Sequence, residues 1–276
     1  ELATVAHLYR AYSLENRGRF AESARHIAIA ERMLPHAAPD LPQGSVIEAS
    51  VGTVSATVRT VGGRLRTGEQ PWLAIAALLR ERALPWSRVY GLILMARVTV
   101  VARDVEAALA LTDEATSVSE EFGLDGMTFA DLLVACRAWA RAELGHTSLG
   151  EFAAVLEQRR RDGHHFFQSY LELSLAEMQI RNGQWAQAEA ALERASQVTV
   201  ELAWSAEVER VKGELATAQA RNASTGSRRR QVDPFGKATK HFQNAIRIAR
   251  DQGAALFEAR ATKGLVRIER LNRTTR

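Results

Sequence analysis

One helical hairpin, residues 175–195, most constrains how this chain can fold. A helical run ends at Asn182-Gly183, and a second helical run begins within two residues. Glycine adopts the left-handed turn needed at such a helix end without a steric clash. The second residue after Gly183 is aromatic, the fifth is small, the ninth is large and apolar, and the twelfth is alanine. These residues are Trp185, Ala188, Leu192 and Ala195. This order predicts two closely packed antiparallel helices.

The same spacing recurs along the chain, which predicts a repeat protein. The anchoring residues of the copies are Gly18, Arg103, Gly145 and Asp233, with a degenerate copy whose register the sequence leaves open near Gly62-Gly63. Phe20, Ser23, Ile27 and Ala30 follow the first anchor, and Phe235, Ala238, Phe242 and Ala245 follow the last. The final interval is longer because a polar loop insertion is expected at 222–233.

The predicted fold class is all-α, a right-handed superhelix of about six helical hairpins plus a closing helix in a single domain, 1–276. No segment shows the sustained alternation of a strand. The expected helices are 1–17, 20–34, 45–60, 70–83, 86–102, 104–121, 125–144, 148–161, 164–182, 184–198, 200–221, 234–251 and 254–271. Prolines at 35, 39 and 42, and turns at Asp125-Gly126 and Asp162-Gly163, punctuate this pattern.

The composition of the chain limits the classes of protein to which it can belong. No apolar run is long enough to span a bilayer, and no signal peptide is visible, so a cytoplasmic location is expected. The chain opens without Met on a helical pattern, which suggests a segment of a longer protein. The single cysteine, Cys136, lies on an apolar stripe and is expected to be buried.

Charge is unevenly distributed along the chain. Residues 221–276 carry 14 basic and 4 acidic side chains, whereas residues 1–220 carry 22 basic and 28 acidic side chains. That asymmetry is compatible with solvated helix faces, an acidic neighbour, nucleic acid or a membrane surface.

The spacing of glycine, aromatic, small, large and alanine resembles the tetratricopeptide repeat, with a period near 40 instead of 34. Residues 139–270 are similar to the helical-repeat region of bacterial signalling proteins that carry a STAND-type ATPase beside a nucleotide cyclase or helix-turn-helix domain. The segments that carry this resemblance are 142–145 (AELG), 175–177 (LAE), 207–215 (EVERVKGEL), 245–249 (AIRIA) and 252–253 (QG). The resemblance implies a sensor or scaffold module controlled by a protein, a peptide or a small-molecule inducer.

In tetratricopeptide arrays the first helix of each hairpin lines a concave groove, and the side chains two, three, six, ten and thirteen residues before the glycine share that face. Carried over to this chain, those positions predict a ligand-binding groove rich in aromatic and charged residues. Its members are Tyr12, Tyr90, Arg97, Trp139, Glu143, Tyr170, Glu177 and Arg181. Because the helices are longer than in the family, burial of some of these residues in the core is an equal alternative.

No catalytic or metal-binding constellation appears in the sequence. His164 and His165 are adjacent and diverge on a helix, and neither a phosphate loop nor a nucleophile elbow is present. Arg228-Arg-Arg230 has no accompanying aromatic for stacking on bases. These absences predict a non-catalytic recognition module without cofactor or metal, and the resemblance implies that it belongs to a bacterial regulator. A nucleic-acid-binding accessory domain that uses the basic C-terminal region, or a regulatory domain of an enzyme, remains the alternative.

Overall fold

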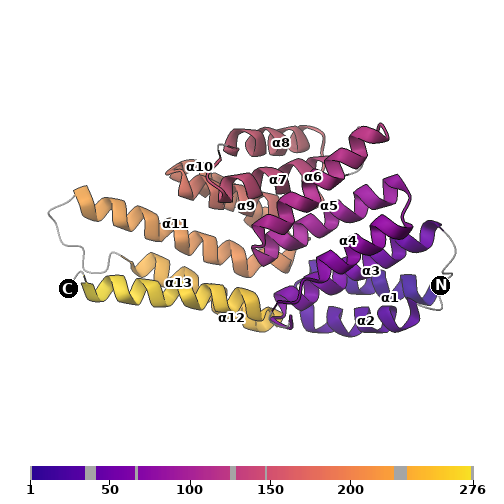
Figure 1. Ribbon diagram of the computed structural model, residues 1–276. Helices are drawn as coiled ribbons and strands as arrows, with labels where there is room; N and C mark the ends of the chain where they lie inside the picture. The colour runs from indigo at the N-terminus through magenta and orange to yellow at the C-terminus, as the bar shows by residue number, and fades with distance from the viewer. Residues whose placement is uncertain are drawn as a thin grey trace. The chain divides into compact units, whose positions relative to one another are not determined.

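The protein is helical throughout the part that its computed structural model describes, which is residues 2–34, 42–65, 68–124, 129–146, 148–226 and 235–274. Thirteen α-helices and one 3-10 helix lie within these ranges, and no strand does (Figure 1). The predicted all-α class is confirmed. No helix of the described residues is both long and apolar enough to cross a membrane.

The chain divides into two compact units where the sequence predicted one domain. The first contains Glu1–Glu15 and Arg19–Gly163, and the second contains Asn16–Gly18 and His164–Arg276.

In the first unit, successive helices pack as antiparallel neighbours, and alternate helices also touch. Ser23 joins the first two helices by donating a hydrogen bond to the carbonyl of Ala11 over 2.8 Å. α3 packs against α5 and α5 against α7, so that α5 is surrounded on several sides. The helices are α1 (Leu2–Asn16), α2 (Phe20–Met33), α3 (Pro42–Val61), α4 (Pro71–Arg82), α5 (Pro85–Ala102), α6 (Val105–Glu121), α7 (Ala130–Glu143) and α8 (Leu149–Arg161).

The second unit repeats this arrangement. α11 packs against α9, α10, α12 and α13, so it occupies the centre as α5 does in the first unit. Its elements are α9 (Gln168–Arg181), α10 (Trp185–Gln197), the 3-10 helix η2 (Leu202–Trp204), α11 (Ser205–Gly226), α12 (Gly236–Gln252) and α13 (Ala255–Thr274).

The left-handed turn predicted after the first helix of a hairpin is present at four anchors. Gly18, Gly145 and Gly183 have φ of +70°, +84° and +71°. Arg103, which takes the glycine position in its copy, has φ of +65° and therefore adopts a conformation that a side chain disfavours. Near the degenerate copy, Gly63 and Gly68 both have positive φ, at +65° and +78°, and α4 begins only at Pro71, so these turns do not fix the register there.

Three segments differ from the predicted boundaries. The predicted helix 200–221 begins as η2, and α11 then runs to Gly226, so the first five residues of the predicted polar loop are helical. α7 begins at Ala130 instead of 125. Pro35, Pro39, the Asp125-Gly126 turn, Arg228–Arg230 and the Asp233 anchor lie outside the described residues.

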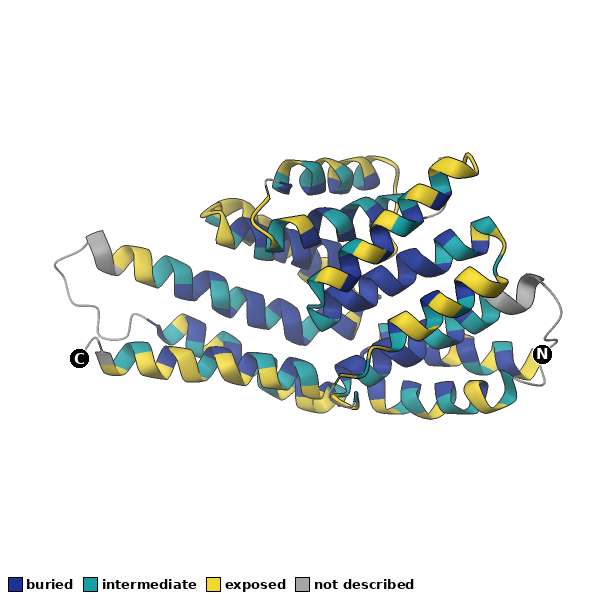
Figure 2. Cartoon of the chain, viewed as in Figure 1, coloured by how far each residue is buried: buried dark blue, intermediate teal, exposed yellow. Residues whose placement is uncertain are grey.

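The interior follows the predicted pattern. Ala176, Ala188 and Leu192 of the reference hairpin are buried, as expected, and Cys136 is a buried free thiol. Every residue of α5 from Gly91 to Val101 is buried, and Figure 2 shows this long buried stretch of the helix. The residues of this stretch therefore belong to the core and cannot line an open groove.

Candidate functional site

The structure distributes the eight predicted groove residues among core, partly exposed and exposed positions. Tyr12, Tyr90, Glu143 and Glu177 are partly exposed, and Arg181 is exposed. In contrast, Arg97, Trp139 and Tyr170 retain only 3%, 1% and 4% of their surface. The predicted exposure of these three residues on a groove is therefore not found. The alternate helices pack side by side, and this packing buries the side-chain rows that the repeat spacing alone assigned to the groove.

Arg97 forms a buried ion pair instead of lining a groove. Its Nη2 lies 3.3 Å from Oε1 of Glu15 on α1 and 3.2 Å from the hydroxyl of Thr57 on α3. Burial raises the pKa of Glu15, and the charge of Arg97 only partly opposes this effect. One long hydrogen bond does not replace the water that a carboxylate loses on burial.

Trp139 and Glu143 both contact Arg103, the residue at the left-handed turn after α5. The guanidinium carbon of Arg103 lies 5.5 Å from the centroid of the Trp139 ring, a cation–π distance. Its Nη1 lies 3.6 Å from Oε1 of Glu143. These contacts give a physical reason for arginine in a position that favours glycine.

Tyr12 and Tyr90 belong to a group of aromatic side chains on the first unit, here called the aromatic surface. Trp86 stacks on Tyr90 with ring centroids 5.4 Å apart and planes 7° apart, and Tyr90 lies 6.0 Å from the ring of Phe129. Burial raises the pKa of Tyr90, and the nearby phenols of Tyr12 and Tyr9 raise it further. The surface therefore consists of Tyr9, Tyr12, Trp86, Tyr90 and Phe129.

The aromatic surface is open to solvent although its members are large. Tyr9 is 68% exposed and Trp86 is 44% exposed. The five side chains come from α1, α5 and the residue that precedes α7. Phe129 has φ of +72°, an uncommon conformation for a bulky residue, and such outliers concentrate at functional positions. Aromatic side chains with an apolar face and a polar tip are enriched where proteins bind one another.

Glu177 belongs to an ion cluster in the second unit, defined by Glu177, Glu207, Arg210 and Arg260. Arg210 of α11 donates to Oε1 and Oε2 of Glu207 over 2.8 and 3.0 Å and also to Glu177 of α9. Arg260 of α13 donates to Oε2 of Glu207 over 3.2 Å. Burial alone would raise the pKa of Glu207, but Arg210 and Arg260 together lower it. The cluster joins three alternate helices and holds the pKa of Glu207 below its ordinary value.

Opposite pH responses are expected at the two buried glutamates. The folded-state pKa of Glu207 is below the unfolded value, so its contribution to stability is present at neutral pH and is lost as the pH falls. The pKa of Glu15 is raised, so its contribution is present at low pH and is lost as the pH rises through that value. In urea unfolding, the stability deficit of Glu207→Gln should stay constant at higher pH and shrink as the pH falls below about 4.3, the ordinary pKa of a glutamate. Glu15→Gln should instead gain stability relative to the wild type as the pH rises above about 4.3. Parallel profiles for the two variants would contradict these assignments.

Sequence reasoning missed Tyr9, Trp86 and Phe129 in the first unit and Glu207 and Arg210 in the second. Trp86 lies four residues before Tyr90, and Tyr9 lies three before Tyr12, so each shares a helix face with a predicted residue. Extending the groove positions by one further helical turn finds Trp86, because α5 is long. Phe129 lies outside the helix, where helix periodicity gives no signal.

Within the described part of the chain, no group of three or more histidine, cysteine or acidic side chains could hold a metal ion. Arg210 and Arg260 hold the pKa of Glu207 below its ordinary value, so this carboxylate is a weak base. No protein-family model matches the chain, and no curated protein matches it.

Proposed function

We propose that this chain is a recognition module that binds a polypeptide through the aromatic surface of its first unit. The observation that carries the proposal is the exposure of Tyr9 and the Trp86–Tyr90 stack on helices of a well-packed unit. Solvent-exposed Trp and Tyr on a rigid support are the residue types that dominate binding energy at protein interfaces. An aromatic surface with several hydroxyl and indole groups is suited to an extended or helical segment with apolar anchors.

The proposed architecture is a tetratricopeptide-like, right-handed superhelix without catalytic groups of its own. The left-handed turns at Gly18, Arg103, Gly145 and Gly183 support it, as does the contact of α3 with α5 and of α5 with α7. The same relation joins α9 to α11 and α11 to α13. Such arrays present the first helix of each hairpin on one face, where α1 and α5 supply four of the five aromatic residues.

The proposed context is a cytoplasmic bacterial regulator in which this module receives a signal for ATPase and output domains elsewhere in the polypeptide. The short segments between residues 142 and 253 that resemble such regulators support this part of the proposal. The aromatic surface and the regulator context are independent, because the surface lies in residues 9–129 and most of the resemblance lies beyond them.

Selection from a displayed library of random linear peptides tests the binding function. Peptides enriched on the wild-type chain should bind Trp86→Ala and Tyr9→Ala at least about tenfold more weakly, because removing an interface anchor costs more than about 1.4 kcal/mol. Fluorescence anisotropy of labelled peptides measures the affinities. Phe122→Ala is the matched control, since Phe122 is also an exposed aromatic of the first unit but lies at the end of α6. Equal losses in all three variants, or enriched peptides indifferent to Trp86 and Tyr9, would reject the aromatic surface as the binding site.

A further inference from the structure

α13 of the second unit is bound on one side by a regular series of ion pairs from α11. Glu207 pairs with Arg260 over 3.2 Å, and Glu214 pairs with Arg267. Each pair is separated by 53 residues in the sequence, so the two helices run in the same direction and in register. The two arginines are seven residues apart, which is about two helical turns, or about 10 Å. Carboxylates at two-turn spacing on one helix therefore recognise cations at the same spacing on α13.

A second series of cations at this spacing lies on the solvent side of α13. Lys263 and Arg270 are seven residues apart, and both are exposed. Steps of three and four residues add three more exposed positions to the same helix side, so that the basic stripe is Ala259, Lys263, Val266, Arg270 and Arg273. The stripe contains no carboxylate. Figure 2 shows exposed residues recurring along α13.

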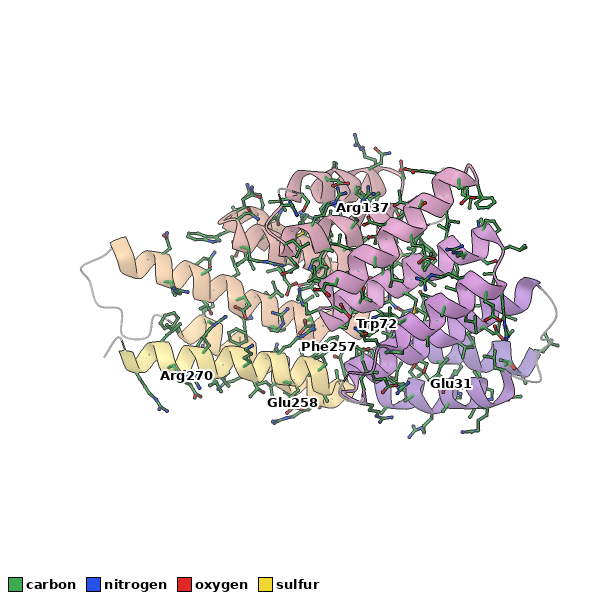
Figure 3. The ribbon with its side chains drawn as sticks, in the orientation of Figure 1. Glu31, Trp72, Arg137, Phe257, Glu258 and Arg270 are labelled. Atoms are coloured by element: carbon green, nitrogen blue, oxygen red, sulfur yellow. The ribbon has the colours of Figure 1, made fainter. Side chains whose placement is uncertain are left out.

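The basic stripe lies on the opposite side of α13 from the core. Phe257, Ala261, Gly264 and Ile268 form the buried side. Figure 3 labels one residue from each side of this helix, the buried Phe257 and the exposed Arg270. Glu258 and Glu269 flank the stripe, and Glu258 is paired with Arg250 over 2.6 Å.

The composition of the stripe favours a protein over a nucleic acid. Val266 is 38% exposed and stands between Lys263 and Arg270, so an apolar centre is flanked by charges, as in a protein interface. No aromatic side chain stands in the stripe to stack on bases. A partner helix that places an apolar residue on Val266 would bring carboxylates at two-turn spacing onto Lys263 and Arg270, just as α11 does on the neighbouring side.

We propose that the basic stripe of α13 binds an acidic amphipathic helix whose carboxylates stand seven residues apart on either side of an apolar residue. The surface is separate from the aromatic surface of the first unit, and its binding does not rest on the function proposed there. The charge excess of residues 221–276 then has a specific recognition role.

The probe is a synthetic helical peptide with two glutamates seven residues apart around a leucine, titrated against the full chain by isothermal calorimetry. A peptide of the same composition with its glutamates moved to different helix faces is the peptide control. The wild type should bind the first peptide at least about tenfold more tightly than the second, because only the first can form both ion pairs. The affinity should fall with added salt.

Charge reversal identifies the surface. Lys263→Glu combined with Arg270→Glu should reduce the affinity at least about tenfold, and a peptide with lysines in place of the two glutamates should restore it. Arg141→Glu combined with Arg161→Glu makes the same change in net charge at two exposed positions of the first unit and should leave binding unchanged. All four side chains are exposed, and unchanged circular dichroism confirms that each variant is folded.

The proposal would be overturned by no preference between the two peptides, by equal loss in both double variants, or by tighter binding of a DNA duplex that depends on Lys263 and Arg270. Trp86→Ala should leave the acidic peptide bound. A failure of the basic-stripe proposal can therefore be distinguished from a failure of the aromatic-surface proposal. Retained binding in the Lys263/Arg270 double variant would also place the peptide elsewhere.

Discussion

Arg210→Met should lower the free energy of unfolding of the second unit by about 3–5 kcal/mol, the usual cost of removing one partner of a buried ion pair. The guanidinium donates to Glu207 and to Glu177, and its side chain is only 9% exposed. Methionine has a similar length but leaves two carboxylates facing each other in a desolvated site. Arg260 remains on Glu207 and compensates only part of the loss.

Arg247→Met is the matched control for this prediction. Arg247 pairs with Asp251 over 3.2 Å, but both side chains are about two-thirds exposed, at 65% and 68%. A pair in water contributes about 0–1 kcal/mol, so this variant should unfold nearly as the wild type does. Urea unfolding measures both free energies, and hydrogen exchange in α9, α11 and α13 should localise the loss caused by Arg210→Met. Equal stability of the two variants would mean that the ion cluster is hydrated.

Helix positions were readable from this sequence because the hairpin signal is local. Gly183 and the second, fifth, ninth and twelfth residues after it lie within one helical hairpin. Each copy of the hairpin places residues of similar size at the same positions. Even Arg103 was assigned to the glycine position, and it has the left-handed conformation that the position demands. Its compensation by Trp139 and Glu143 was not predictable, since both belong to a later hairpin.

The groove was less readable because exposure depends on how neighbouring helices lie. The spacing rule placed Tyr90 and Arg97 on one face of the same helix, yet Tyr90 reaches the surface and Arg97 is buried against Glu15. The two residues are seven apart, and different neighbouring side chains cover the two turns of α5 on which they lie. Periodicity identifies a face, whereas burial at each level is a property of tertiary packing.

A methyl group added at Gly264 should destabilise the second unit by about 1–3 kcal/mol, the range for overpacking a core. The Cβ of an alanine at Gly264 of α13 would lie 2.3 Å from Cε1 and 2.6 Å from Cζ of Phe242. A Cβ at Gly213 of α11 would lie 3.0 Å from Cε1, Cε2 and Cζ of the same ring. Phe242 of α12 is fully buried, so its ring fills the space between two helices that glycine allows to come close.

Helix propensity alone predicts the opposite sign, because alanine stabilises a helix interior by about 1 kcal/mol relative to glycine. Gly150→Ala in α8 isolates that effect, since a Cβ there meets nothing within 4 Å. Thermal unfolding should therefore show Gly150→Ala at or above the wild type and Gly264→Ala below it. Two glycine-to-alanine changes with opposite signs would separate local propensity from packing.

A double-mutant cycle assigns the cost of Gly264→Ala to the Phe242 ring. Phe242→Leu removes part of the ring and leaves a cavity, which is itself destabilising. In the double variant the new methyl group enters space that the ring has vacated, so the combined cost should be smaller than the sum by about 0.5–3 kcal/mol. Additive costs would show that the methyl group at Gly264 disturbs something other than Phe242. In that case, the close approach of α11 and α13 would not depend on this ring.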